Sequence, residues 1–166
     1  MGREDLIHVK LRTHLKELKF RLVAGQFPNG SDDELQILTI RVSGETPRLH
    51  HLNSFVPDLV ALSEKNKLIL FIEIKPKRSA SDEKKLLTLL SKYKNETLKA
   101  LAEHPFFSKS HKTLGKDLQN FNFFAGISFY CETLNKDLNP EIFYFLYSNE
   151  LDRFQIKYRK ENANGF

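Results

Sequence analysis

Two apolar runs joined by a short polar segment constrain the fold of this chain more than any other feature of its sequence. Residues 68–75 are almost entirely apolar and rich in Ile, Leu and Phe, which predicts a strand buried on both faces. Glu73 and Lys75 lie at the end of that strand, and because side chains at i and i+2 share a face, they point the same way. The preceding run, residues 56–62, alternates likewise and carries Asp58 near its start. We therefore expect a hairpin of buried strands with charged residues at one end.

The length of the polar turn fixes how the two strands pair. Pairing Ser63 with Leu68 leaves a four-residue loop, a common hairpin length, and places Asp58 directly opposite Glu73. Cβ atoms of such facing residues are about 4.5–5.5 Å apart, so the two carboxylates repel unless one is protonated or a cation lies between them. Lys75 is the cation that the hairpin itself supplies on that face. The arrangement favours a divalent metal ion.

Length and composition bound the class of protein. The 166 residues are expected to form one domain, residues 1–166, with 40% apolar and 28% charged residues. No apolar run approaches the length of a membrane span, and the N-terminus lacks a hydrophobic signal core, so a cytoplasmic protein without a membrane partner is expected. Cys131, the single cysteine, excludes an internal disulfide framework. The net charge of +5 is compatible with a polyanionic partner.

Helical and strand patterns flank the hairpin. Leucines spaced at helical intervals predict an amphipathic helix over residues 4–22, and β-branched residues predict a first strand over residues 35–42. A second helix, capped by Ser79 or Ser81, is expected to run to Glu103.

Three further strands are predicted over residues 121–131, 141–148 and 152–159. The predicted order is helix, three strands, helix, strand, followed by two extra C-terminal strands. The fold class is thus α/β (α+β), with a central mixed sheet flanked by helices.

With this order, Pro57-Asp58 and Glu73-Ile74-Lys75 resemble the signature of the PD-(D/E)xK nuclease superfamily, which has a restriction-endonuclease-like fold. The resemblance covers the core from about residue 4 to residue 131. It implies that Asp58, Glu73 and the backbone carbonyl of Ile74 hold Mg²⁺, with Mn²⁺ as a substitute. It also implies that Lys75 orients the attacking water and offsets negative charge on the phosphate.

The same resemblance suggests further site residues. Glu4 is the candidate for a second metal ligand, by analogy with family members that carry a glutamate on their first helix. Lys77 and Arg78, just past the site, are candidates for holding the phosphate backbone of the nucleic acid. Lys92, on the basic face of the second helix, is a further candidate contact, although a solvated face is the more common role of such lysines.

The leading hypothesis is a Mg²⁺-dependent endonuclease that cuts DNA, with a homodimer or a partner subunit supplying the second site. An RNA endonuclease of the cap-snatching type is an alternative, which His8 or His50 near Asp58 would favour. A nuclease-fold subunit that binds nucleic acid and needs a partner for activity is another. The exonuclease branch resembling RecB is disfavoured, because Leu89 stands where that branch has Gln, four residues before Tyr93.

Overall fold

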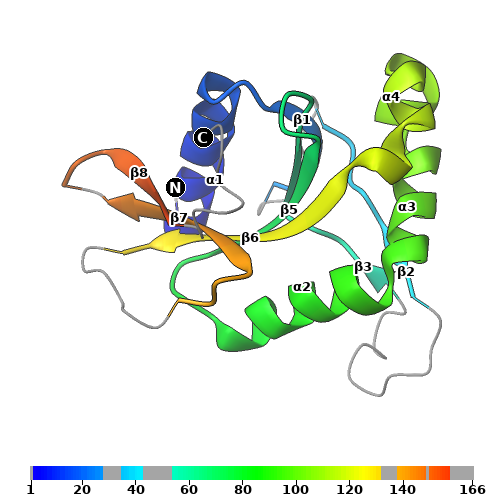
Figure 1. The fold of residues 1–166 in the computed structure, drawn as a ribbon. Coiled ribbons are helices and arrows are strands. Elements are labelled where there is room, and N and C mark those ends of the chain that lie inside the picture. The colour runs from blue at the N-terminus through cyan, green and yellow to red at the C-terminus, as the bar shows by residue number, and fades with distance from the viewer. Residues whose placement is uncertain (1, 28–34, 43–53, 132–137, 149, 158–166) are drawn as a thin grey trace.

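A mixed six-stranded sheet forms the centre of the protein, with α1 on one face and α2 on the other (Figure 1). The computed structural model describes residues 2–27, 35–42, 54–131, 138–148 and 150–157. In spatial order the strands of the sheet are β1 (Arg21–Gly25), β4 (Leu59–Ser63), β5 (Leu68–Lys75), β6 (Asn122–Tyr130), β7 (Ile142–Ser148) and β8 (Arg153–Lys157). The helices are α1 (Arg3–Glu17), α2 (Ala80–Lys92), α3 (Lys94–Glu103) and α4 (Lys112–Lys116), with a π-helical turn η1 (Phe106–Ser110) and a 3-10 turn η2 (Leu118–Asn120). The predicted α/β class, with helices flanking a mixed sheet, is confirmed.

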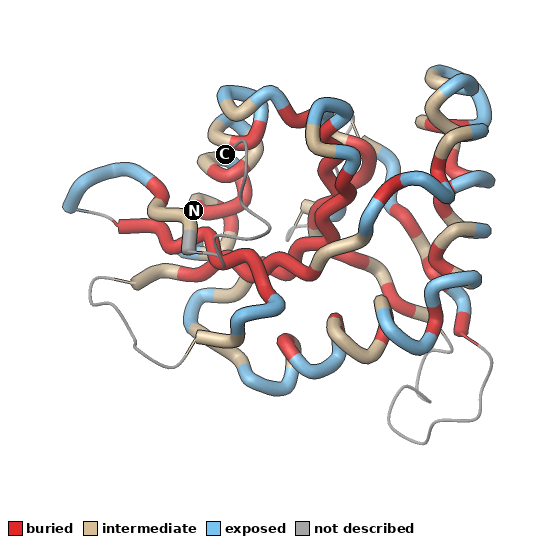
Figure 2. Tube along the Cα trace, viewed as in Figure 1, coloured by how far each residue is buried: buried red, intermediate tan, exposed pale blue. Residues whose placement is uncertain are grey.

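The strand alternation predicted for the hairpin is confirmed by the two hydrophobic cores. Phe71 of β5 packs in the core that contains Leu86 of α2, whereas Ile72 packs in the core that contains Leu11 of α1. Figure 2 shows the buried residues concentrated in the sheet, with exposed residues along the outer sides of the helices. Glu73 and Lys75, two and four residues after Phe71, therefore project from the face that α2 covers.

Strand directions bring the ends of several elements to one edge of the sheet. β4 and β5 pair antiparallel, β5 pairs parallel with β6, and β6 pairs parallel with β7. The amino end of β4 and the carboxyl ends of β5 and β6 therefore lie at the same edge. The chain leaves β5 at this edge and enters α2 within a few residues. Any site built from Asp58, Glu73 and Lys75 is thus at this edge.

The first helix is shorter than predicted, and a strand follows it that the sequence analysis missed. α1 ends at Glu17, because Lys19 adopts a left-handed conformation with a φ of 68°. The Phe20 N–H donates to the Leu15 carbonyl and the Lys19 N–H to the Lys16 carbonyl, the hydrogen bonds of a Schellman helix end with lysine in the usual glycine position. The chain then forms β1, which pairs antiparallel with β4 as the first strand of the sheet.

The strand predicted over residues 35–42 is wrong for most of its length. Only β2 (Ile40–Arg41) is a strand, and it pairs with β3 (Ser54–Phe55) in a separate two-stranded sheet. The predicted order of helix, three strands, helix and strand holds for the main sheet, but β1 takes the place of the strand predicted over residues 35–42. In the described part of the chain, no helix is both long enough and apolar enough to cross a membrane.

The long helix predicted to end at Glu103 is two helices. α2 begins after Ser79, whose side chain accepts a hydrogen bond from the Asp82 N–H, as the capping prediction requires. It ends at Lys92, and Tyr93, with a φ of −116° and a ψ of 38°, separates it from α3. The last two predicted strands are confirmed as β7 and β8, and residues 158–159 lie outside the described part.

Candidate active site at the carboxyl end of β5

The predicted register of the hairpin is confirmed. Ser63 pairs with Leu68 and Leu59 pairs with Ile72 in the β4–β5 ladder. Asp58, the residue before β4, therefore stands at the position opposite Glu73. Proline at position 57 cannot donate a ladder hydrogen bond, which is consistent with regular pairing ending at this point.

Asp58 accepts backbone hydrogen bonds through both its side chain and its carbonyl group. Its Oδ2 accepts from the Ile74 N–H at 2.8 Å, and its carbonyl accepts from the Gln26 N–H, just beyond β1, at 2.9 Å. The N–H and C=O of one strand residue point to the same side of the strand. Because the Ile74 N–H points toward Asp58, the Ile74 carbonyl points toward Asp58 as well. The structure thus brings Asp58 beside the backbone of Ile74, as the sequence analysis predicted.

Glu73 is almost completely buried, with 7% of its surface exposed. The pKa of its carboxyl is raised to about 9, first by burial and then by the charge of Asp58 and a hydrogen bond between the two carboxyl groups, while Lys75 opposes the rise. Without a cation between them, Glu73 therefore carries a proton at neutral pH. The sequence predicts this, because two facing carboxylates repel unless one is protonated or a cation lies between them.

The ammonium group of Lys75 lies between two carboxylates. Its Nζ is 3.9 Å from an oxygen of Glu73 and 3.9 Å from Oδ2 of Asp82 in the first turn of α2. Burial lowers the pKa of Lys75, but Asp82, Glu73, Asp58 and Glu4 together raise it above its ordinary value. Lys75 is therefore a fixed positive charge at neutral pH.

Glu4 also belongs to this group of side chains. It is half-buried in the first turn of α1, and its carboxyl pKa is raised by burial and by Asp58, while Lys75 lowers it. The helix containing Glu4 packs on the opposite face of the sheet from α2, so the site lies where both helices reach the end of β5. The sequence analysis named Glu4, Asp58, Glu73 and Lys75, and the structure brings all four within electrostatic range.

Asp82 is the residue that the sequence analysis did not place here. It lies in the first turn of α2, where a negative charge is favourable next to the helix N-terminus. An acidic side chain in the first turn of the helix that follows Glu73-Ile74-Lys75 was the available signal. Its contact with Lys75, however, depends on the path of residues 76–79, which no local pattern specifies.

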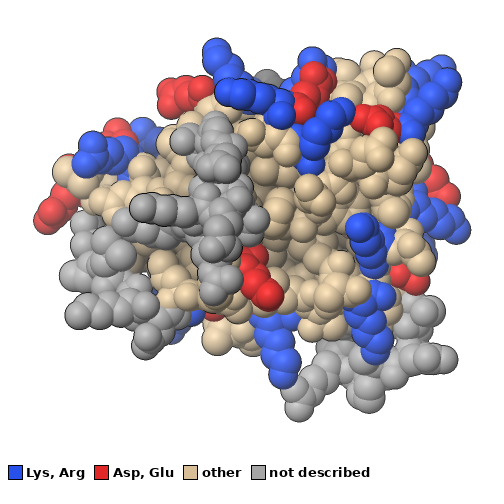
Figure 3. Space-filling view, viewed as in Figure 1, with Lys and Arg blue, Asp and Glu red and all other residues tan. Residues whose placement is uncertain are grey.

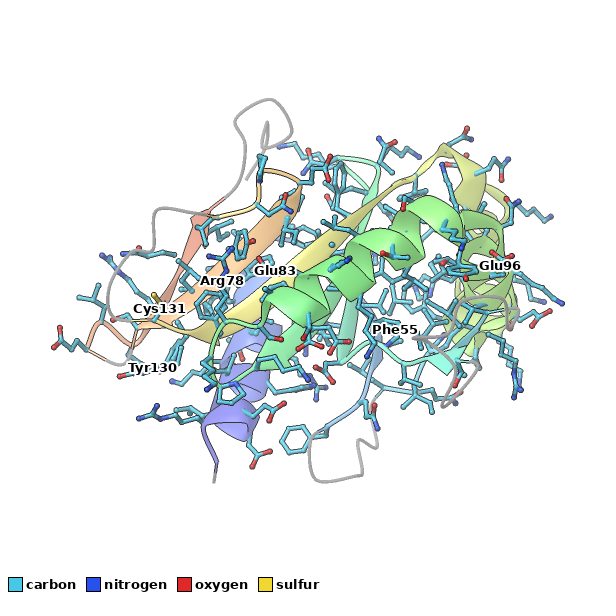
Figure 4. The ribbon with its side chains drawn as sticks, turned by 90° about the horizontal axis from the view of Figure 1, so that it is seen from below. Phe55, Arg78, Glu83, Glu96, Tyr130 and Cys131 are labelled. Carbon is cyan, nitrogen blue, oxygen red and sulfur yellow. The ribbon has the colours of Figure 1, made fainter. Side chains whose placement is uncertain are left out.

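The three predicted phosphate contacts have different surroundings. Arg78 binds the buried Glu83, with its Nε and Nη2 at 3.2 and 3.3 Å from the two carboxylate oxygens. Figure 4 shows these two side chains together at the start of α2. Lys77 is exposed. Lys92 is ten positions beyond Asp82 along α2, roughly 15 Å away, and its Nζ lies over the Tyr93 ring. Figure 3 shows lysine and arginine side chains spread around one face rather than gathered in a single patch.

One groove in the described part of the surface is separate from these carboxylates. A groove of about 760 Å³ between α2 and β6 is lined by Arg78, Glu83, Leu87 and Phe123, among other residues, and not by Asp58, Glu73 or Lys75. Of the two histidines considered as extra ligands, His8 is buried with its ring 5.0 Å from that of Phe27. His50 lies outside the described residues, so a histidine ligand stays a prediction.

The donors at the end of β5 fit a hard divalent cation. Among the described residues, no group of three or more His, Cys, Asp or Glu side chains is arranged to hold an ion by side chains alone. Two carboxylates and the carbonyl that faces them are nevertheless a donor set that Mg²⁺ accepts, since this ion usually keeps several waters. The raised pKa of Glu73 points the same way, because a cation between the carboxylates would replace the shared proton.

Comparison with known proteins leaves the family open. No model of a known protein family and no curated protein matches the chain. One solved structure that matches is the crystal structure of an XisH family protein from Nostoc punctiforme PCC 73102, at 13% identity and a TM-score of 0.39, covering 92% of this chain and 98% of that one.

Proposed function

We propose that this protein is a divalent-metal-dependent endonuclease of the PD-(D/E)xK type, which hydrolyses phosphodiester bonds of nucleic acid, with DNA favoured over RNA. One observation carries the proposal: Asp58 and Glu73 meet on adjacent strands, with Lys75 beside them on the same face. The chain order α1, β1, β4, β5, α2 and β6 in the main sheet supports it, because it follows the order of helix, three strands, helix and strand on which the sequence resemblance was based.

Mg²⁺ would be held by Asp58, Glu73 and the Ile74 carbonyl, with Mn²⁺ as a substitute. When bound, the ion supplies polarisation of the scissile phosphate and a lower pKa for the attacking water. The water oxygen attacks phosphorus, and the bond from phosphorus to the leaving sugar oxygen breaks. Glu4, whose pKa responds to the charges of Lys75 and Asp58, is the proposed ligand of a second ion.

Lys75 acts as an electrostatic group rather than a base. Because the surrounding carboxylates raise the pKa of its ammonium group, it stays charged at neutral pH and donates hydrogen bonds. It thereby orients the attacking water and stabilises the negative charge that grows on the phosphate oxygens. Two strands of a duplex require two such sites, so a homodimer or a partner subunit forms part of the proposal.

Cleavage assays on the purified chain test the function. Plasmid, linear DNA and single-stranded RNA are incubated with Mg²⁺, Mn²⁺ or EDTA, using the wild type and the variants Asp58→Ala, Lys75→Ala and Glu96→Gln. We expect metal-dependent nicking that Asp58→Ala and Lys75→Ala abolish and that Glu96→Gln, in the first turn of α3, retains. Binding of nucleic acid without cleavage by the wild type would instead favour a nucleic-acid-binding subunit that needs a partner.

A further inference from the structure

The position of Lys75 depends on two elements of the fold. Its backbone belongs to the end of β5, whereas one of its two carboxylate partners, Asp82, belongs to α2. The side chain of Lys75 is 33% exposed and that of Asp82 is 20% exposed, so this ion pair is partly shielded from water. A lysine side chain has four carbons and many rotamers, so a single contact holds it poorly.

The first turn of α2 is anchored strongly enough to present Asp82 at a fixed place. The Asp82 N–H donates to the Ser79 hydroxyl at 3.4 Å, which caps the helix. The next residue, Glu83, is buried, bound through both oxygens by Arg78, and accepts a hydrogen bond from the Tyr144 hydroxyl of β7. The helix end is thus tied to the sheet on the side next to Asp82.

A cation between Asp58 and Glu73 would change the surroundings of Lys75. Glu73 would share its charge with the ion, and the ion would repel the ammonium group. Asp82 would then be the carboxylate that keeps Lys75 at the end of β5. Its attraction does not compete with the ion, because the Asp82 contact involves an oxygen outside the Asp58–Glu73 pair.

We propose that Asp82 is a positioning residue that holds the Lys75 ammonium group over the site while Glu73 is engaged with the metal ion. The inference rests on the proposed nuclease function for its catalytic consequence, but the structural part applies to the protein without metal or substrate. Asp82 acts through Lys75 and is not itself a ligand of the ion.

Variants of Asp82 test the proposal with three measurements. Asp82→Asn removes the charge at constant size, Asp82→Glu restores it, and Glu96→Gln in the first turn of α3 is the matched control. The first measurement is the NMR order parameter of the Lys75 ammonium group in the metal-free protein, with Lys75→Arg used to assign the signal. The second is Mn²⁺ affinity by calorimetry, and the third is kcat and KM for DNA cleavage.

We expect Asp82→Asn to lower the Lys75 order parameter and to leave Mn²⁺ affinity within about twofold of the wild type. We expect the same variant to reduce kcat roughly tenfold to a hundredfold with little change in KM. Asp82→Glu recovers part of both losses, and Glu96→Gln changes neither. An unchanged order parameter in Asp82→Asn would overturn the inference even if the wild type proves inactive. A loss of Mn²⁺ affinity as large as in Asp58→Asn would overturn it in favour of a metal-ligand role. Absence of cleavage by the wild type counts against the proposed function alone.

Discussion

Oδ2 of Asp58 lies 2.8 Å from the backbone nitrogen of Ile74, so this carboxylate takes the place of a backbone acceptor where the ladder between β4 and β5 ends. The bond fixes one acid of the candidate site relative to the strand that carries the other, Glu73. Burial and the charge of the nearby Asp58 raise the pKa of Glu73 to about 9. Geometry and charge at this point therefore depend on each other.

Glu73→Gln is expected to stabilise the metal-free protein. The pKa of Glu73 is raised to about 9 in the folded protein, from about 4.5 in the unfolded chain. The contribution of Glu73 to the free energy of unfolding is therefore complete below pH 4.5 and is lost as pH rises toward 9. Glutamine resembles the protonated acid and avoids that loss, giving a gain of roughly 1–3 kcal/mol at pH 7 to 8. Urea unfolding in EDTA measures the gain. A variant less stable than the wild type at pH 8 would show that the carboxyl is ionised there.

Binding of Mg²⁺ is expected to release a proton and to strengthen as pH rises. Because Glu73 is protonated at neutral pH and a metal ligand must be ionised, affinity should increase about fivefold to tenfold per pH unit between pH 7 and 8.5. Calorimetric titration in two buffers of different ionisation enthalpy counts the protons released. Affinity that is independent of pH over this interval would contradict proton displacement from Glu73.

Arg78 and Lys77 are adjacent in sequence but are expected to respond very differently to alanine. Arg78→Ala leaves the buried Glu83 carboxylate without its cation. We expect the free energy of unfolding to fall by about 2–3 kcal/mol, less than for a fully buried ion pair, because the Arg78 side chain is 25% exposed. Lys77→Ala is expected to change stability by less than about 0.5 kcal/mol, because Lys77 is exposed. Thermal unfolding of both variants tests the contrast. Equal stability would show that Arg78 is free for nucleic acid rather than engaged in the fold.

His104 is expected to reduce stability at mildly acidic pH. Its Nδ1 accepts from the Phe106 N–H at 3.1 Å, and its Nε2 is 3.2 Å from the Gln36 carbonyl, so the buried ring is neutral. Burial lowers the pKa of His104, although hydrogen bonds to backbone carbonyls oppose this shift. The contribution of His104 to stability is therefore present above its pKa in the unfolded chain, near 6.5, and is lost as pH falls through its lower pKa in the folded protein. Comparing unfolding of the wild type and His104→Gln at pH 7 and pH 5 measures the effect. We expect the variant to lose less stability on acidification, and an equal loss would assign it to other groups.

The hairpin and its register were predictable because two constraints agree. Strand alternation fixes which residues share a face, and the length of the turn fixes that Ser63 pairs with Leu68. The positions of Asp58 and Glu73 follow from these local rules. Glu4 was predictable from helical spacing together with the family resemblance, and the structure brings it within range of Asp58 and Lys75.

The remaining errors arise where tertiary contacts override local pattern. The helix predicted to reach residue 22 ends at Glu17, because Lys19 adopts a left-handed conformation without the glycine that usually signals it. β1 is a short strand stabilised by pairing with β4, which no property of residues 21–25 alone reveals. The turn into α2 places Arg78 against Glu83 and Asp82 against Lys75, and no local pattern specifies these contacts. The phosphate-binding role of Arg78 stays a prediction.

The central claim is that Asp58 and Glu73 hold a divalent cation beside Lys75. Anomalous scattering from crystals soaked in Mn²⁺, above pH 8 where the shared proton is most easily displaced, tests it directly. The structure predicts a strong peak between the two carboxylates, within bonding distance of the Ile74 carbonyl, that is lost in Asp58→Asn. A wild-type crystal with no peak at this position, or with its peak bound by other residues, would contradict the claim.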